Sequence, residues 1–175
     1  MLLDLPSKPP RVTDISLRRE VPEDEAFLFK LYCSTRAEEI AAWGWPPVQQ
    51  NAFLKMQFNG QRHSYRSQFP EAEHHVILLQ TDPIGRLLVS KNHVEFTLVD
   101  IALLPEQRNR GIGSALLRNL LAEATSSNRK VRLHVLKSNP AQNLYSRLGF
   151  SRVSEDGLYS QMEWIPEVSP APLTQ

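Results

Sequence analysis

The stretch LLPEQRNRGIGSALLRNLL, residues 103–121, joins an apolar segment to a helical pattern through a turn that contains two glycines. Glycine is a poor helix former, so Gly111 and Gly113 need a reason other than helix propensity. A helix N-terminus offers unpaired backbone N–H groups and a positive dipole end, and glycine allows a phosphate group to approach them. After the turn, apolar residues recur at the spacing of one helix face: Leu116, Leu117, Leu120, Leu121 and Ala124.

Two interpretations of this turn remain open from the residues alone. In the first, the turn binds a diphosphate-type ligand, to which Arg108 and Arg110 add charge-assisted hydrogen bonds. In the second, the glycines only allow a tight strand-to-helix turn to pack closely. The common nucleotide motifs are disfavoured. A P-loop needs a lysine after its second glycine, and a dinucleotide fingerprint needs a third glycine where this chain has Leu116.

Outward from the turn, the hydrophobic pattern predicts alternating strands and helices. Short turns between three consecutive strands predict an antiparallel meander, and the helix after the glycine turn predicts a crossover to a parallel neighbour. The fold class is therefore α/β (α+β), with a mixed, mostly antiparallel sheet of about six or seven strands flanked by about four helices, in the order β-α-α-β-β-β-α-β-α-β-β. The expected strands are 14–21, 75–80, 84–90, 94–104, 131–137, 151–154 and 158–164, and the expected helices begin near residues 22, 48, 113 and 140.

Length and composition indicate one globular domain. The chain has 175 residues, of which 41% are hydrophobic and 22% charged, and its 20 Lys and Arg nearly balance 19 Asp and Glu to a net charge of +1. This balance gives no sign of a nucleic-acid partner, and no stretch is long and apolar enough for a membrane span. The single cysteine, Cys33, is typical of a reducing compartment, so we expect a cytoplasmic protein without a metal. The domain is expected at 13–165, between tails at 1–12 and 166–175.

Two short motifs stand out, separated by one predicted helix and one predicted strand. They are RNRGIG, residues 108–113, and AQNLYSRLGF, residues 141–150. They resemble, in this order, the R/Q-x-x-G-x-G/A turn and the A-x-x-L-Y-x-x-x-G-F segment of the GNAT superfamily of N-acetyltransferases. The expected order of elements also resembles the GNAT fold, so the resemblance covers about residues 14–164.

The resemblance implies acetyl-CoA as the acyl donor. The family's glycine turn holds the pyrophosphate through its backbone, and the hydroxyl of Ser114 is a further donor here. The strand before the turn, with Leu103 and Leu104, resembles the one whose backbone pairs with the pantetheine arm, between two strands that splay apart. The turn residues implied are Arg108, Asn109, Arg110, Gly111, Ile112 and Gly113.

The family's asparagine, seven residues before its tyrosine, is replaced by Ser138 in this chain. Asn139 follows one place later. This residue is either a cofactor contact or only a helix N-cap, and both interpretations remain open.

Attack of an amine on a thioester needs a base, a proton donor and a stabilised oxyanion. Tyr145 lies where the family's tyrosine donates a proton to the leaving thiolate, although its apolar helix stripe equally suits a core residue. A backbone N–H near Leu103 would stabilise the oxyanion. The candidate bases are Glu95, Asp100 and His134.

Strand alternation separates these bases. By plain alternation, Glu95 and Thr97 share a face with Ile101, and Asp100 points to the other side. A carboxylate in the apolar run LVDIALL is costly to bury unpaired, so Asp100 indicates either a site or a structural hydrogen bond. For His134, a structural histidine is the alternative to a base.

The predicted function is that of an N-acetyltransferase, an acyltransferase for groups other than aminoacyl, which moves an acetyl group from acetyl-CoA to a primary amine by direct attack on the thioester. The acceptor is a small-molecule or peptide amine, and a homodimer is in keeping with relatives. The alternative is a catalytically silent GNAT-like module that binds coenzyme A or a protein partner. Trp43 and Trp45 are expected to line the acceptor pocket or to pin a loop, and Glu38 and Glu39 to attract a cationic acceptor or to form a solvated helix face.

Overall fold

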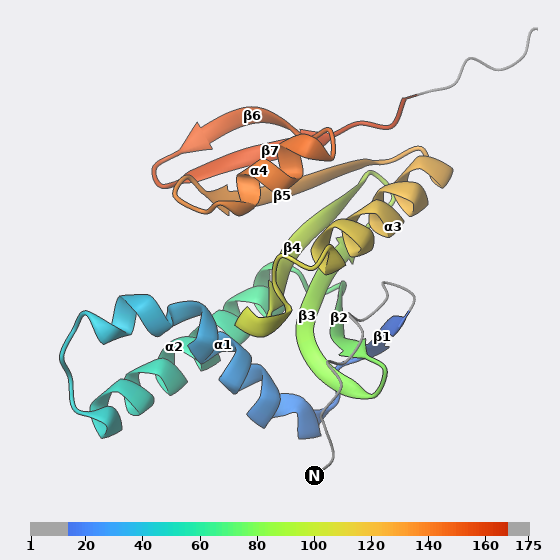
Figure 1. The fold of residues 1–175 in the computed structure, drawn as a ribbon. Helices are drawn as coiled ribbons and strands as arrows, with labels where there is room; N and C mark the ends of the chain where they lie inside the picture. The colour runs from blue at the N-terminus through green and yellow to red at the C-terminus, as the bar shows by residue number, and fades with distance from the viewer. Residues whose placement is uncertain (1–13, 168–175) are drawn as a thin grey trace, which may run out of the picture.

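Seven strands form one sheet flanked by helices (Figure 1). The computed structural model describes residues 14–167, which hold four α-helices and two short 3₁₀-helices. The strands are β1 (Ile15–Arg19), β2 (Ala72–Leu79), β3 (Asp82–Lys91), β4 (Glu95–Leu103), β5 (Lys130–Leu136), β6 (Ser151–Asp156) and β7 (Tyr159–Trp164). The helices are η2 (Pro22–Asp24), α1 (Glu25–Ala41), α2 (Pro47–Gln68), η3 (Pro105–Gln107), α3 (Ile112–Ser126) and α4 (Ala141–Arg147).

The sheet has the strand order β1-β2-β3-β4-β5-β7-β6. Neighbouring strands among β1 to β4 are antiparallel; short turns join β2 to β3 and β3 to β4, whereas α1 and α2 lie between β1 and β2. β5 is parallel to β4, because α3 carries the chain back before β5 begins. The predicted fold class and element order are confirmed.

The main hydrophobic core lies between the sheet and the helices α3 and α4. The predicted apolar face of α3 is buried, and Tyr145 of α4 packs into the same core. A smaller core around Phe58 joins α1 to α2, and α1 contacts β3 and β4. The first half of the sheet therefore lies between α3 on one face and the α1–α2 pair on the other.

Strand β4 carries a bulge at Val99. Leu98 lies opposite Val89 of β3, whereas Asp100 lies opposite Leu88, so one residue of β4 has no counterpart in β3. A bulge of this kind bends the strand and increases its local twist.

The bulge changes which side chains share a face. Phe96 and Leu98 face the α3 core, and after the extra residue Ile101 faces that core again. Asp100 therefore lies on the same face as Glu95. The prediction from plain alternation, which separated these two carboxylates, is wrong because one inserted residue shifts the alternation by one.

The pairing between β4 and β5 ends halfway along β4. The parallel ladder joins Glu95–Leu98 to Lys130–Leu133 and stops there, although both strands continue. Figure 1 shows the two strands close together near their starts and diverging toward their ends. Within the described residues, the second half of β4 therefore has β3 on one side and no strand on the other.

The ends of α4 follow the predicted capping with a shift of one residue. Pro140 occupies the N-cap position, and the Asn139 side chain accepts a hydrogen bond from the N–H of Ala141 at 2.9 Å. Gly149, with a φ of +92°, follows the end of the helix in a left-handed conformation that favours glycine.

The predicted tails lie largely outside the described residues. Residues 166 and 167 are described, and Pro166 is buried. The domain boundaries stay a prediction.

Candidate active site

The glycine turn forms an uncapped N-terminus of α3. Gly111 is the N-cap residue, and its φ of +81° is a left-handed conformation that favours glycine. It has no side chain that could bond the free N–H groups of the first helical turn, so these groups remain available to an anion.

Space around the turn tests the packing interpretation. Among the described residues, no heavy atom lies within 4 Å of a Cβ added at Gly111. At Gly113, an added Cβ would meet a Leu144 methyl carbon at 3.6 Å, which is an ordinary contact. Packing therefore does not require glycine at position 113, and the open space suits the close approach of a ligand.

Polar side chains surround the turn. Arg108 donates from Nε to the carbonyl of Leu103 at 2.9 Å, which ties the turn to the end of β4. Arg110 donates to the side chain of Gln107 at 2.8 Å, and Asn109 has a φ of +58°, which asparagine tolerates. Both guanidiniums are exposed and keep further N–H donors. Together with the free helix N–H groups, this donor set fits a diphosphate.

A groove of about 370 Å³ lies beside the open half of β4. One wall comes from β3, β4 and the end of β5, and the opposite wall comes from α1 and α2. A second cavity, of about 310 Å³ between β1–β3 and α3, contains none of the predicted site residues. The groove is lined by Leu31, Tyr32, Thr35, Arg36, Glu39, Gln61, Arg86, Asp100, Ile101, Ala102, Leu136 and Asn139.

Asp100 lies in the groove wall with one carboxylate oxygen held and the other free. Arg86 donates from Nε to Oδ2 of Asp100 at 2.5 Å and from Nη2 to Oε1 of Gln61 at 2.6 Å. Within residues 14–167, Oδ1 of Asp100 accepts no hydrogen bond, and the side chain is 22% exposed against 8% for Arg86. Asp100 thus has the partner that a buried carboxylate needs and still presents an oxygen to the groove.

Tyr145 is buried beneath the open end of the sheet. Its ring packs edge-on against Phe150, with centroids 5.8 Å apart. Burial raises the pKa of its hydroxyl to about 12, and the negative charge of Asp100 contributes to the shift. The hydroxyl therefore keeps its proton at neutral pH, and it lies near enough to Asp100 to sense that charge.

The other two candidate bases lie outside the groove. Glu95, at the start of β4, pairs with Lys130 at 3.4 Å and with Arg132 at 3.1 Å. His134 is an exposed residue of β5. Neither residue lines the groove, so the geometry favours Asp100 among the three.

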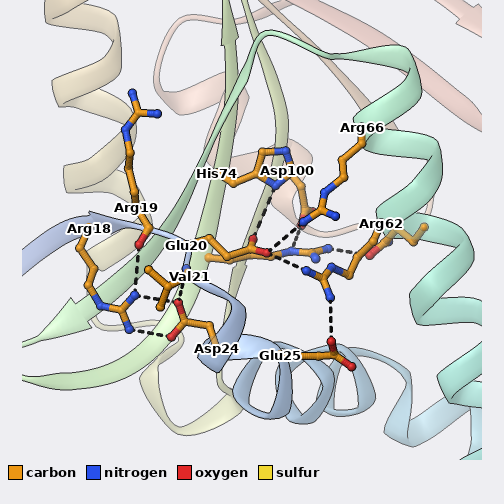
Figure 2. A network of polar contacts seen from close by, with 12 residues as sticks. Arg18, Arg19, Glu20, Val21, Asp24, Glu25, Arg62, Arg66, His74 and Asp100 are labelled. Carbon is orange, nitrogen blue, oxygen red and sulfur yellow. Dashed lines mark hydrogen bonds and ion pairs between the residues drawn. The ribbon is translucent and has the colours of Figure 1, made fainter.

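Ion pairs hold α1 and α2 against the sheet, as Figure 2 shows. Arg18 of β1 makes two hydrogen bonds to Asp24 at the start of α1, at 2.6 and 2.7 Å. Glu20, just after β1, pairs with Arg62 of α2 at 2.9 Å and with His74 of β2 at 3.6 Å. Because α1 and α2 form one wall of the groove, these pairs help to hold that wall against the sheet.

The aromatic residues between α1 and α2 pin a loop and do not line the groove. Trp43, Trp45 and Phe53 form a cluster with ring centroids 5.0 to 5.5 Å apart. Of the two neighbouring acids, Glu39 lines the groove and Glu38 does not.

The groove residues that the sequence did not single out include Arg36, Gln61 and Arg86. A signal existed for Arg86, because a charged residue inside the apolar strand IGRLLVS needs a buried partner, and Asp100 in LVDIALL is complementary to it. Nothing comparable marks Arg36 or Gln61, which lie in polar stretches of helices.

Between residues 14 and 167, no helix combines the length and the apolar character needed to cross a bilayer. In the same range, no group of three or more His, Cys, Asp and Glu side chains is placed to hold a metal ion. The expectations of no metal and of a homodimer stay predictions.

Comparisons with known proteins cover most of the chain. The family model described as "Acetyltransferase (GNAT) family" matches residues 34–150, and no curated protein matches. A crystal structure of PaiA N-acetyltransferase from Thermoplasma acidophilum, in complex with coenzyme A, is 19% identical with a TM-score of 0.64, over 86% of this chain and 98% of that one.

Two further solved structures share the fold. An acetyltransferase from Thermus thermophilus is 18% identical with a TM-score of 0.63, over 88% of this chain and 98% of that one. Spermidine N-acetyltransferase from Vibrio cholerae, in complex with CoA and spermine, is 22% identical with a TM-score of 0.58, over 87% and 96% of the two chains. The resemblance read from the two motifs is confirmed: with the family model matching more than half of its length, the chain belongs to the acetyltransferase (GNAT) family.

Proposed function

We propose that this chain is an acetyl-CoA-dependent N-acetyltransferase that acts on a primary amine by direct attack on the thioester. One observation carries the proposal: the unpaired half of β4, which lines the groove, leads through η3 and the glycine turn to the uncapped N-terminus of α3. An anion site, an open strand edge and a cavity with a carboxylate thus lie along one continuous path.

The donor side of this path consists mainly of backbone groups. When bound, acetyl-CoA supplies an acetyl group activated as a thioester. The N–H groups at Gly111, Ile112 and Gly113 would hold its pyrophosphate, with Arg108 and Arg110 adding charge. The β4 edge between Val99 and Leu103 would bond the pantetheine arm in place of a strand and offer an N–H to the developing oxyanion.

On the acceptor side, Asp100 orients the amine and takes its proton. A lysine-type amine has an ordinary pKa of about 10.4 and an α-amino group about 7.7–8.0, so each needs a base to become nucleophilic near neutral pH. Asp100 lines the groove; Arg86 holds its Oδ2, and its Oδ1 accepts no hydrogen bond from residues 14–167. The proton passes to Oδ1 directly or through a water.

Tyr145 assists the departure of the thiolate by donating a hydrogen bond. Its hydroxyl has a pKa of about 12, whereas a thiol has an ordinary pKa of about 8.5. Full proton transfer would therefore be uphill by more than three pKa units, or roughly 5 kcal/mol. A hydrogen bond from the protonated phenol stabilises the leaving sulfur without that cost, and solvent completes the protonation.

The donor site is tested by calorimetric titration with acetyl-CoA. We expect micromolar binding by the wild type and a loss of roughly a hundredfold in the double variant Gly111→Glu, Gly113→Glu, because two carboxylates would repel the pyrophosphate. The matched control is Gly60→Glu, Gly157→Glu, since added Cβ atoms there also meet no heavy atom within 4 Å and Gly157 also has a positive φ, +49°. An equal loss in the control, or no binding by the folded wild type, would refute the proposal.

The silent-module alternative is tested by turnover. We expect Tyr145→Phe to keep its affinity for acetyl-CoA and to lower kcat roughly a hundredfold, the lower end of the loss when one hydrogen-bond donor to a developing negative charge is removed. The measurement is release of free thiol from acetyl-CoA over a panel of amines. If the wild type binds acetyl-CoA and releases no thiol with any amine, the module alternative replaces the enzyme.

A further inference from the structure

The charged side chains of the groove come in opposite pairs. Arg86 pairs with Asp100, and Arg36 pairs with Glu39 at 3.1 Å. The groove wall thus carries two positive and two negative groups, and each carboxylate already faces a guanidinium. A polyamine, which carries several positive charges, would meet no unpaired negative charge here.

The hydrogen-bond capacity of these pairs favours a ligand with oxyanion acceptors. Two guanidiniums carry about ten N–H donors. Within the described residues, Arg36 donates one hydrogen bond, to Glu39, and Arg86 donates two, to Asp100 and Gln61. Donors therefore remain in excess, and Arg36 is the accessible one, with a side chain that is 38% exposed.

Arg36 is also placed to change partners. Its guanidinium lies over the ring of Tyr32, 5.6 Å from the centroid, and both side chains line the groove. Its bond to Glu39 is an i,i+3 surface pair, which contributes little to stability. A carboxylate on a ligand can therefore replace Glu39 at little cost, and the guanidinium can bind it with two parallel hydrogen bonds.

The charges of the groove residues also act on the hydroxyl of Tyr65. Burial raises the pKa of Tyr65 to about 12; the negative charge of Asp100 adds to this rise, and the positive charges of Arg86 and Arg36 oppose it. Arg86 also lies 5.7 Å from the centroid of this ring. Asp100 and Arg36 thus line the same groove, and the charges of both act on the Tyr65 hydroxyl.

We infer that the acceptor is an amine that also carries a carboxylate, of the class of free amino acids, with Asp100 receiving the amine and Arg36 binding the carboxylate. The inference rests on the proposed function. It makes Arg36 the residue that decides between amino acids and polyamines.

The test is binding of matched acceptors to the protein saturated with coenzyme A, measured by calorimetry, with thiol release from acetyl-CoA as a second readout. The probes are the common L-amino acids, their amides and spermidine. We expect at least one amino acid to bind about tenfold or more tightly than its amide, because the amide lacks the charge that Arg36 recognises.

Two variants show whether Arg36 is responsible. Arg36→Gln should remove the preference for the carboxylate without weakening the binding of the amide, because Glu39 then loses its cationic partner and can attract the amine. Arg152→Gln is the matched control, because Arg152 makes an i,i+3 pair with Glu155 at 2.8 Å outside the groove, and it should keep the preference.

Several results would overturn the inference. These are spermidine or the amides binding as tightly as every amino acid, no amino acid binding at all, or a preference that survives Arg36→Gln. If acetyl-CoA still binds and another amine releases thiol, only the inference fails. Failure of acetyl-CoA to bind removes the proposed function and the inference with it.

Discussion

The two ends of β4 differ in their neighbours. The first half, Glu95–Leu98, is paired on both sides, with β3 and with β5. The second half, after the bulge at Val99, keeps β3 and loses β5. One strand therefore has an end built like an ordinary sheet interior and an end that leaves a backbone edge open beside a groove.

A carboxylate on the same face of each half shows what this difference does. Glu95 contacts two cations that both come from β5, Lys130 and Arg132. Asp100 has no β5 neighbour, contacts Arg86 through one oxygen and keeps the other free within the described part of the chain. Pairing with β5 thus places Glu95 in a structural ion pair. Asp100 lies beyond the end of that pairing and keeps an oxygen available for chemistry.

The largest expected effect comes from exchanging each acid for its amide. Asp100→Asn should lower kcat about a hundredfold or more, because an amide cannot accept the amine's proton, with the affinity for acetyl-CoA unchanged. Glu95→Gln should leave kcat within about twofold, because its partners lie outside the groove. Steady-state kinetics with thiol detection measures both.

The contrast between the two halves of β4 is refuted if Asp100→Asn and Glu95→Gln change kcat equally. A large loss of kcat in Glu95→Gln, with the melting temperature unchanged, would move the base to the paired end. Asp100→Glu serves as a second variant if the asparagine leaves Arg86 unpaired and lowers the folded fraction, since a glutamate keeps the charge.

Deletion of Val99 tests the bulge itself. Because Val99 is the extra residue, its removal leaves every other side chain of β4 on its present face and makes the strand regular. We expect β4 to pair further along β5, with acetyl-CoA affinity about tenfold or more lower and an unfolding free energy that is equal or higher. Calorimetric titration and chemical denaturation measure the two quantities. Unchanged acetyl-CoA affinity would mean that the open edge does not serve the donor.

The sequence predicted the elements well and the faces of β4 less well. The stripe of α3 and the meander follow from spacing and turn length, which are local properties. The bulge is not local, because the run TLVDIALL has no glycine or proline at Val99, and an extra residue exists only relative to the register of β3. Alternation counted through Val99 therefore misplaced Asp100.

The residues of the candidate site also differ in how far the sequence predicts them. Turn residues such as Gly111 can be recognised in the sequence, because a positive φ and an uncapped helix start restrict the residue type. The groove residues Arg36 and Gln61 meet Asp100 and Arg86 only through the packing of α1 and α2 on the sheet. Their role depends on contacts between distant segments, which spacing along the chain does not encode.

A smaller effect is expected on stability at the paired end. Glu95→Gln should lower the free energy of unfolding by about 0.5–1 kcal/mol, because Lys130 and Arg132 keep Glu163, at 3.1 and 3.0 Å, as their remaining partner. Urea denaturation at pH 7 measures it, and high salt should shrink the difference. A loss above about 2 kcal/mol would show that the cluster needs both carboxylates, as a buried network does.

The smallest effect is the pH dependence of Glu163. Burial raises the pKa of its carboxyl, but hydrogen bonds from Lys130 and Arg132 outweigh burial and hold the pKa below its ordinary value of 4.5. A carboxyl with a lowered pKa in the folded state stabilises the fold above the unfolded value, and this contribution is lost as the pH falls through the folded pKa. Wild type should therefore exceed Glu163→Gln in unfolding free energy by a few tenths to about 1 kcal/mol at pH 7 and lose this advantage below about pH 4.5.

Parallel urea titrations at pH 7 and pH 3.5 measure that advantage, and thiol release at pH 7 supplies the second readout. If the paired end of β4 only holds the sheet together, Glu163→Gln lowers the unfolding free energy at pH 7 and leaves kcat unchanged. A change in kcat without a change in stability would mean that the ion pairs act on the open end through β5, and the two halves of β4 would no longer be separable.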